Sequence, residues 1–136
     1  MTNKLNEVKL ITLPKILDQR GNLTFLQNPD QIPFKIQRVF WTYDVPGGET
    51  RGGHAYHSQD ELIIALSGSF DVVLTFLNGS TKKVSLNRSY FALYIPAKTW
   101  RRMENFSTNA LGLHLSSLKY TKSDYIRDFD LYKKGK

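Results

Sequence analysis

Residues 51–61, which read RGGHAYHSQDE, carry side chains suited to proton transfer. His54 lies two residues before Tyr56 and seven before Glu61. Residues i and i+2 of a strand point to the same face, so His54 and Tyr56 are expected to share one. Histidine titrates near neutral pH and can take or return a proton. The stretch is therefore a damaged metal site, a metal-free proton-transfer site, or a strand with an incidental histidine.

The spacing around this stretch favours one known motif. Residues 48–68 fit the first cupin motif, G-x5-H-x-H-x3–4-E-x6-G, with Tyr56 in place of the second histidine. Residues 90–105 fit part of the second motif, G-x5-P-x-G-x2-H-x3-N, but both glycines and the histidine are replaced. Arg101 stands where that histidine would be. Two partial matches at a compatible separation predict a cupin jelly roll.

The ligand count argues against a metal centre. His54 and Glu61 are kept, but arginine has no lone pair for a metal and its charge repels a divalent cation. His57 alternates away from His54, and His114 falls in another predicted strand. We therefore expect no metal and no cofactor. Donors to stabilise an enolate are the arginines and tyrosines, which include Tyr43, Tyr56 and Tyr94.

Short β-rich runs separated by turns would position these side chains. The expected strands lie within residues 34–44, 62–66, 70–77, 82–86, 90–96 and 110–117. Asn78-Gly79 predicts a hairpin. Turn residues recur about every ten positions, which is typical of an all-β sandwich or barrel. Only residues 121–134 have helical spacing, with Ser123 as the expected cap.

Composition narrows the class of protein. A chain of 136 residues fits one domain, residues 1–136, and the formal net charge is +7. The positive charge indicates either a solvated surface or a site for an anion such as pyrophosphate. No nucleic-acid motif, 18-residue apolar run or signal-peptide pattern is found, so we expect no nucleic-acid partner and no membrane span. The lack of cysteine fits the cytoplasm.

Several further motifs resemble one enzyme family across residues 18–130. They are D-x-R-G-N-L (18–23), I-P-F-K-I-Q-R-V (32–39), R-G-G-H-A (51–55), L-S-G-S (66–69), L-Y-I-P (93–96), Trp100, N-F-S (105–107) and D-Y-I-R-D-F-D (124–130). Together they are similar to the nucleotide-sugar 3,4-ketoisomerases, metal-free cupins that act on dTDP-4-keto-6-deoxyglucose. The resemblance implies a homodimer whose reaction moves the ketone from C4 to C3 through an enediol, for deoxyamino sugars of surface glycans such as lipopolysaccharide O-antigen.

The same resemblance assigns roles to residues. It makes His54 the expected base. Tyr56 is the expected proton donor because its spacing from His54 places both side chains on one face of the strand. Arg20, Arg51 and Arg101 are candidates for holding the pyrophosphate, and Tyr43 and Glu61 are further substrate-binding candidates. The segment 124–130 is expected to serve structure or dimer packing rather than the site.

One departure from the family pattern keeps alternatives open. Many members have R-G-x-H-x-H, whereas this chain has Tyr56 at the last position. A phenol is a better acid than base at neutral pH, so a two-histidine proton shuttle is in doubt. The alternatives are a 3- or 5-epimerase of a similar dTDP-4-keto sugar and a non-catalytic nucleotide-sugar-binding module. The stereochemistry at C4, the nucleotide and the final glycan are not determined by the sequence.

Overall fold

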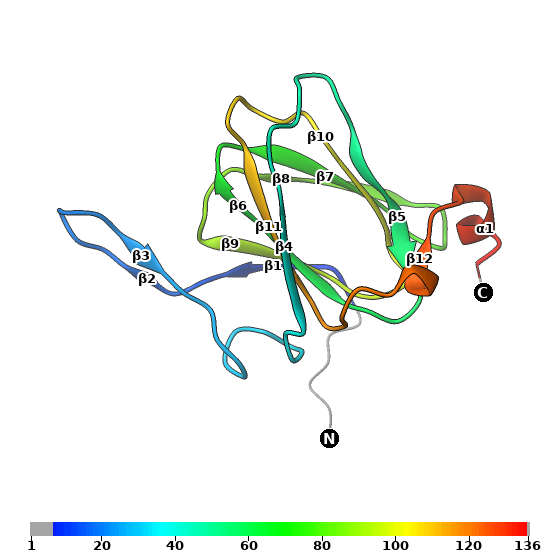
Figure 1. Cartoon of the computed structure of the whole chain (residues 1–136), viewed down its shortest axis with the longest axis horizontal. Coiled ribbons are helices and arrows are strands. Elements are labelled where there is room, and N and C mark those ends of the chain that lie inside the picture. The colour runs from blue at the N-terminus through cyan, green and yellow to red at the C-terminus, as the bar shows by residue number, and fades with distance from the viewer. Residues whose placement is uncertain (1–6, 136) are drawn as a thin grey trace.

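The computed structural model describes residues 7–135 of the chain as two facing β-sheets with a protruding hairpin and a short C-terminal helix (Figure 1). The strands are β1 (Lys9–Thr12), β2 (Lys15–Ile16), β3 (Leu23–Thr24), β4 (Arg38–Thr42), β5 (Arg51–Tyr56), β6 (Glu61–Ser67), β7 (Phe70–Thr75), β8 (Thr81–Leu86), β9 (Phe91–Ile95), β10 (Trp100–Glu104), β11 (Leu111–Ser116) and β12 (Tyr125–Ile126). The helical elements are the 3₁₀ turn η1 (Lys122–Asp124) and the helix α1 (Phe129–Lys133).

Both large sheets are five-stranded, and every strand pairing is antiparallel. The first has the order β1-β9-β6-β11-β4 and the second the order β12-β5-β10-β7-β8. Strands that follow one another in sequence lie in different sheets at several places, for example β4 and β5. This arrangement confirms the predicted all-β cupin jelly roll.

The strand β6 shows why its sequence is an unbroken apolar run. Ile63 and Ala65 point into the core between the sheets, together with residues such as Phe70 and Leu93. Leu62 and Ile64 point outward into a second cluster, which is covered by the segment 26–36. A strand buried on both faces has no polar face, and its alternation disappears.

Most predicted strands are confirmed, with small shifts at their ends. The hairpin at Asn78-Gly79 joins β7 to β8, and Gly79 has the positive φ of 89° that such a turn requires. The strand expected within residues 34–44 is shorter and begins at Arg38. Within residues 7–135, no helix has the length and apolar character needed to cross a membrane.

The prediction of one helix over residues 121–134 is wrong, although a short C-terminal helix is present. Tyr125 and Ile126 instead pair with Tyr56 and Ala55 and extend the sheet edge as β12. The helix begins only after Asp128, whose side chain accepts hydrogen bonds from the Asp130 and Leu131 amides. Asp128, rather than Ser123, is therefore the N-cap.

Candidate active site

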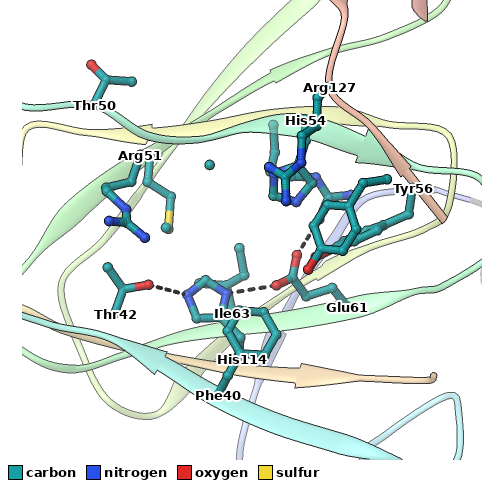
Figure 2. Close-up of a pocket in the computed structure, with 14 residues that line it drawn as sticks. Phe40, Thr42, Thr50, Arg51, His54, Tyr56, Glu61, Ile63, His114 and Arg127 are labelled. Atoms are coloured by element: carbon teal, nitrogen blue, oxygen red, sulfur yellow. Dashed lines mark hydrogen bonds and ion pairs between the residues drawn. The ribbon is translucent and has the colours of Figure 1, made fainter. Parts of the chain in front are cut away.

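A pocket of about 390 Å³ opens between the two sheets. Its walls are contributed by β4, β6 and β11 of one sheet, by β5 and β10 of the other, and by residues 125–127 (Figure 2). Ile63 and Met103 belong both to the core and to the pocket lining, so the pocket lies directly on the packed interior. Most of the other residues that line the pocket are polar or ionisable.

A bulge in β5 brings Arg51 and His54 into the same pocket. Residues three apart in a regular strand point to opposite faces. Here β10 pairs Arg101 with His54 and Met103 with Arg51, so two steps along β10 match three steps along β5. Gly52 lies within the extra step and has φ 77°, a conformation that residues other than glycine rarely adopt.

His54 is partly buried, and both of its ring nitrogens are buried without a hydrogen-bond partner among residues 7–135. Burial, followed by the positive charge of Arg101, lowers the pKa of His54 from 6.5 to about 3. The imidazole is therefore neutral at physiological pH, with a lone pair available for a proton. An unsatisfied buried polar group is costly, and such groups are concentrated at functional sites.

Three aromatic rings pack together at this end of the pocket. The centroid of the His54 ring lies 4.8 Å from that of Tyr56 and 5.1 Å from that of Tyr125, and the two tyrosine rings are 4.8 Å apart. Burial, together with the charge of Glu61, raises the pKa of Tyr56 well above 10. The Tyr56 phenol therefore keeps its proton and can donate a hydrogen bond to an oxyanion.

Next to these rings, the buried side chains of Arg101, Glu61 and His114 are linked by an ion pair and a hydrogen bond. Glu61 forms an ion pair with Arg101, and its second oxygen lies 2.8 Å from His114 Nδ1 (Figure 2). The remaining Arg101 donors reach the Thr99 carbonyl, and the guanidinium lies 4.8 Å from the Tyr56 ring centroid. Burial alone would raise the pKa of Glu61, but the His114 hydrogen bond and the Arg101 charge outweigh it and lower the pKa to about 2.

The structure gathers five of the seven residues proposed from the sequence. His54, Tyr56, Glu61, Arg51 and Arg101 all line the pocket. Arg101 is only 1% exposed and its described donors are engaged, so it reaches the pocket as a buried cation rather than a free anion ligand.

Arg20 and Tyr43 do not line the pocket of their own chain. Arg20 lies in the turn of the β2–β3 hairpin, where it pairs with Asp18 at 2.8 Å. Tyr43 follows β4 and is 61% exposed. Substrate contacts by these two residues stay predictions.

The sequence reasoning missed several pocket residues, among them Thr42, His114, Tyr125 and Arg127. His114 was set aside because it belongs to another strand, yet β11 pairs with β6 and places it next to Glu61. Tyr125 and Arg127 come from the segment expected to serve packing, and β12 pairing carries them to the pocket edge. The available indication was the dense run of aromatic and charged residues at 124–130.

The donor set does not resemble a cupin metal centre. Among residues 7–135, no group of three or more His, Asp or Glu side chains is arranged to hold a metal ion. The carboxylate that would be a ligand, Glu61, is instead shared between Arg101 and His114. The Arg101 guanidinium supplies a fixed positive charge beside the residues that a cupin metal would contact.

Comparison with known proteins agrees with this geometry. A family model described as FdtA, WxcM-like C-terminal, matches residues 6–136. The chain belongs to the FdtA family. A curated relative, TDP-4-oxo-6-deoxy-alpha-D-glucose-3,4-oxoisomerase of Aneurinibacillus thermoaerophilus, is 35% identical over 128 residues, covering 94% of this chain and 91% of the relative.

Two of the solved structures similar to this chain are 3,4-ketoisomerases. WlaRB of Campylobacter jejuni, a TDP-quinovose 3,4-ketoisomerase, is 36% identical with a TM-score of 0.89, covering 96% of this chain and 100% of its own. QdtA of Thermoanaerobacterium thermosaccharolyticum, solved as a variant with TDP-4-keto-6-deoxyglucose, is 34% identical with a TM-score of 0.91, covering 96% of this chain and 94% of its own.

Proposed function

We propose that the protein is a metal-independent 3,4-ketoisomerase of TDP-4-keto-6-deoxyglucose. The observation that carries the proposal is the neutral His54, whose buried ring nitrogens have no hydrogen-bond partner within residues 7–135, beside the protonated Tyr56 in a pocket edged by arginines. A base and an acid whose pKa values are pushed apart suit proton transfer on carbon. The relatives with established names act on such sugars.

In this proposal His54 removes the proton from C3 of the 4-keto sugar. The electrons of the C3–H bond form an enediolate with its negative charge on the C4 oxygen. The Tyr56 hydroxyl donates a hydrogen bond to that oxygen, and the charge of Arg101 beneath the Tyr56 ring stabilises the anion further. Protonation of C4 and transfer of the O3 proton to the C4 oxygen then leave a ketone at C3 and a hydroxyl at C4.

The pyrophosphate is assigned to the arginines at the pocket edge. Arg51 and Arg127 line the pocket, and their guanidinium groups suit paired hydrogen bonds to phosphate oxygens. Glu61 and Arg101 contribute to substrate binding indirectly, because their ion pair holds the Arg101 charge in place in the pocket wall. Tyr43 and Arg20 are kept as candidates for outer contacts.

We also propose a homodimer, built with the β2–β3 hairpin. The hairpin projects from the barrel (Figure 1), and it exposes Ile16, Leu17 and Leu23. The outer face of the edge strand β4 also exposes apolar side chains, Val39 and Trp41. A second copy could cover both, and its hairpin would then be the route by which Arg20 reaches a pocket. A cytoplasmic location fits the substrate, because sugar nucleotides are made from nucleoside triphosphates.

The decisive experiment is incubation with TDP-4-keto-6-deoxyglucose in D₂O, followed by NMR of the sugar. We expect a 3-keto product with solvent deuterium in the ring, whereas an epimerase would invert a centre without moving the ketone. His54→Asn should lower turnover by about 100-fold or more, the range for loss of a general base. The matched control is His57→Asn, because His57 is exposed and lies outside the pocket. An unimpaired His54→Asn protein would remove the role assigned to His54.

A further inference from the structure

A hydroxyl, an imidazole and a carboxylate form a line in the pocket wall opposite His54. Thr42 Oγ1 lies 3.1 Å from His114 Nε2, and His114 Nδ1 lies 2.8 Å from Glu61 Oε2 (Figure 2). All three residues line the pocket. Glu61 is ionised because its pKa is about 2, so Nδ1–H donates to it and Nε2 faces the threonine hydroxyl.

The fold holds this line rigidly. The His114 ring is stacked on Phe40, with centroids 4.4 Å apart and planes 7° from parallel. Arg101 occupies the other Glu61 oxygen and keeps the carboxylate from turning away. His114 pairs with Phe40 of β4 and with Ile63 of β6, so the strand register on both sides of β11 fixes the position of the imidazole along the sheet.

His54 and this line come from different sheets. Thr42, His114 and Glu61 belong to β4, β11 and β6 of the first sheet, whereas His54 belongs to β5 of the second. Figure 2 shows His54 on one side of the pocket and Thr42 with His114 on the other. A flat enediolate bound between the sheets would therefore meet a proton-transfer group on each face.

We propose that Thr42, supplied with protons by His114, is the acid that protonates C4, a role that rests on the proposed ketoisomerase function. The Thr42 O–H bond breaks as the C4–H bond forms from the enediolate electrons. Nε2–H of the His114 imidazolium replaces the lost hydroxyl proton, leaving a neutral imidazole still donating to Glu61. The O3 proton passes to the adjacent C4 oxygen as C3 becomes the ketone and C4 the alcohol. His54 then loses the C3 proton to water, and His114 regains a proton from water. Thr42 is the catalytic residue, and His114 and Glu61 are positioning residues.

The relay specifies the configuration of the product. The C3 proton leaves toward β5, and the new C4 proton arrives from the β4 side, so the two use opposite faces of the ring. In a 6-deoxyglucose ring, H3 and H4 project from opposite faces. The product is therefore the 3-keto sugar with the gluco configuration at C4, which the H4–H5 coupling constant identifies.

The test separates proton removal at C3 from protonation at C4. Wild type, Thr42→Val and Thr42→Ser are each mixed with TDP-4-keto-6-deoxyglucose in D₂O, with enzyme in excess. Valine keeps the shape but removes the hydroxyl, and serine keeps the hydroxyl. We expect Thr42→Val to retain C3 deuterium exchange in recovered substrate while forming 3-keto product about 100-fold more slowly. Thr42→Ser should restore product formation.

Two further variants sharpen the result. Thr108→Val removes an exposed hydroxyl outside this pocket and should leave both rates close to wild type. His114→Asn should show the same split as Thr42→Val, because it interrupts the supply of protons rather than proton removal at C3.

Contrary results are distinct for the two proposals. Wild-type protein with neither C3 exchange nor product would overturn the ketoisomerase function and the relay with it. An active wild type would instead overturn the relay alone in any of three cases. These are a Thr42→Val or His114→Asn protein with unchanged product formation, exchange and product rates that fall together, and a product with the galacto configuration at C4.

Discussion

At the scale of single residues, burial shifts the pKa values of the neighbouring His54 and Tyr56 rings in opposite directions. Removal from water disfavours charge on both side chains, which lowers the pKa of His54 and raises that of Tyr56. The histidine is thereby held as a neutral base and the phenol as a protonated donor. One physical effect produces opposite chemical roles, and no metal is needed to separate them.

This environment predicts an unusual acid limb in the pH profile. The base form of a histidine with the ordinary pKa of 6.5 falls by about 25-fold between pH 7 and pH 5. His54, with a pKa of about 3, stays neutral over that range, so protonation of His54 should change kcat/KM by less than about two-fold. Initial rates of product formation measured from pH 5 to pH 8 check this. A unit slope below pH 6.5 would contradict the neutral base.

The buried ion pair makes a second prediction, on stability. Glu61→Gln removes the carboxylate that compensates the Arg101 charge, and leaving a buried charge unpaired costs about 3–5 kcal/mol. The control is Glu104→Gln, which breaks partly exposed pairs with Arg102 and Lys83 and should cost about 1 kcal/mol or less. Urea unfolding at pH 7 measures both. Equal losses for the two variants would show that Arg101 is not dependent on Glu61.

At the scale of elements, the bulge in β5 determines which side chains meet. Without the extra residue, Arg51 would point away from His54 and the pocket would lose a cation at its edge. The short strand β12 acts in the same way on the other side of β5. It pairs Tyr125 with Tyr56 and so carries the neighbouring Arg127 to the pocket.

Gly52→Ala tests the bulge. Because φ is 77° at Gly52, alanine should cost about 1–2 kcal/mol and favour a regular strand that turns Arg51 outward. We expect KM for the sugar nucleotide to rise several-fold with a smaller change in kcat, measured by steady-state kinetics. The control is Gly53→Ala, whose added methyl would meet Trp100 at an ordinary contact distance of 3.7 Å. An unchanged KM for Gly52→Ala would separate Arg51 from substrate binding.

At the scale of the whole molecule, the core between the sheets is buried, but the β2–β3 hairpin and the edge strand β4 expose apolar side chains. The core between the sheets is packed by residues such as Phe70 and Leu74, each at most 1% exposed. In contrast, Leu17 in the β2–β3 hairpin is 72% exposed and Trp41 on the edge strand is 58% exposed. Exposed apolar side chains gathered in a large patch are typical of a protein interface, so a second copy is proposed to cover these residues.

The proposed dimer can be tested on the hairpin. Leu17→Asp would bury a charge in the interface, so we expect the dimer to weaken by about 100-fold or more and the protein to sediment as a monomer at micromolar concentration. Leu131→Asp is the control, because Leu131 is 61% exposed on α1, away from the hairpin. A dimer unaffected by Leu17→Asp would place the interface elsewhere. Analytical ultracentrifugation distinguishes the cases.

Much of the fold and part of the site could be predicted from local patterns. The strands follow from the alternation of apolar and polar residues and from the turn residues between them. That His54 and Tyr56 lie on the same face follows from the pleat of one strand. The C-terminal segment was the main error, because helical spacing at 125, 126 and 129 also suits an edge strand followed by one helical turn. The helical preference of residues 125 and 126 was weaker than the gain from pairing with β5, so these residues form a strand.

The sequence by itself determined the jelly roll, the placement of His54 beside the Tyr56 phenol, and the cation at Arg101 in place of a metal ligand. Only the tertiary structure decided that His114 and Thr42 join Glu61, that Arg51 and His54 share a wall, and that Arg20 lies outside its own pocket. The reason is geometric. Neighbours along one strand are fixed by its two-residue period, whereas neighbours across strands depend on register, bulges and the facing of two sheets.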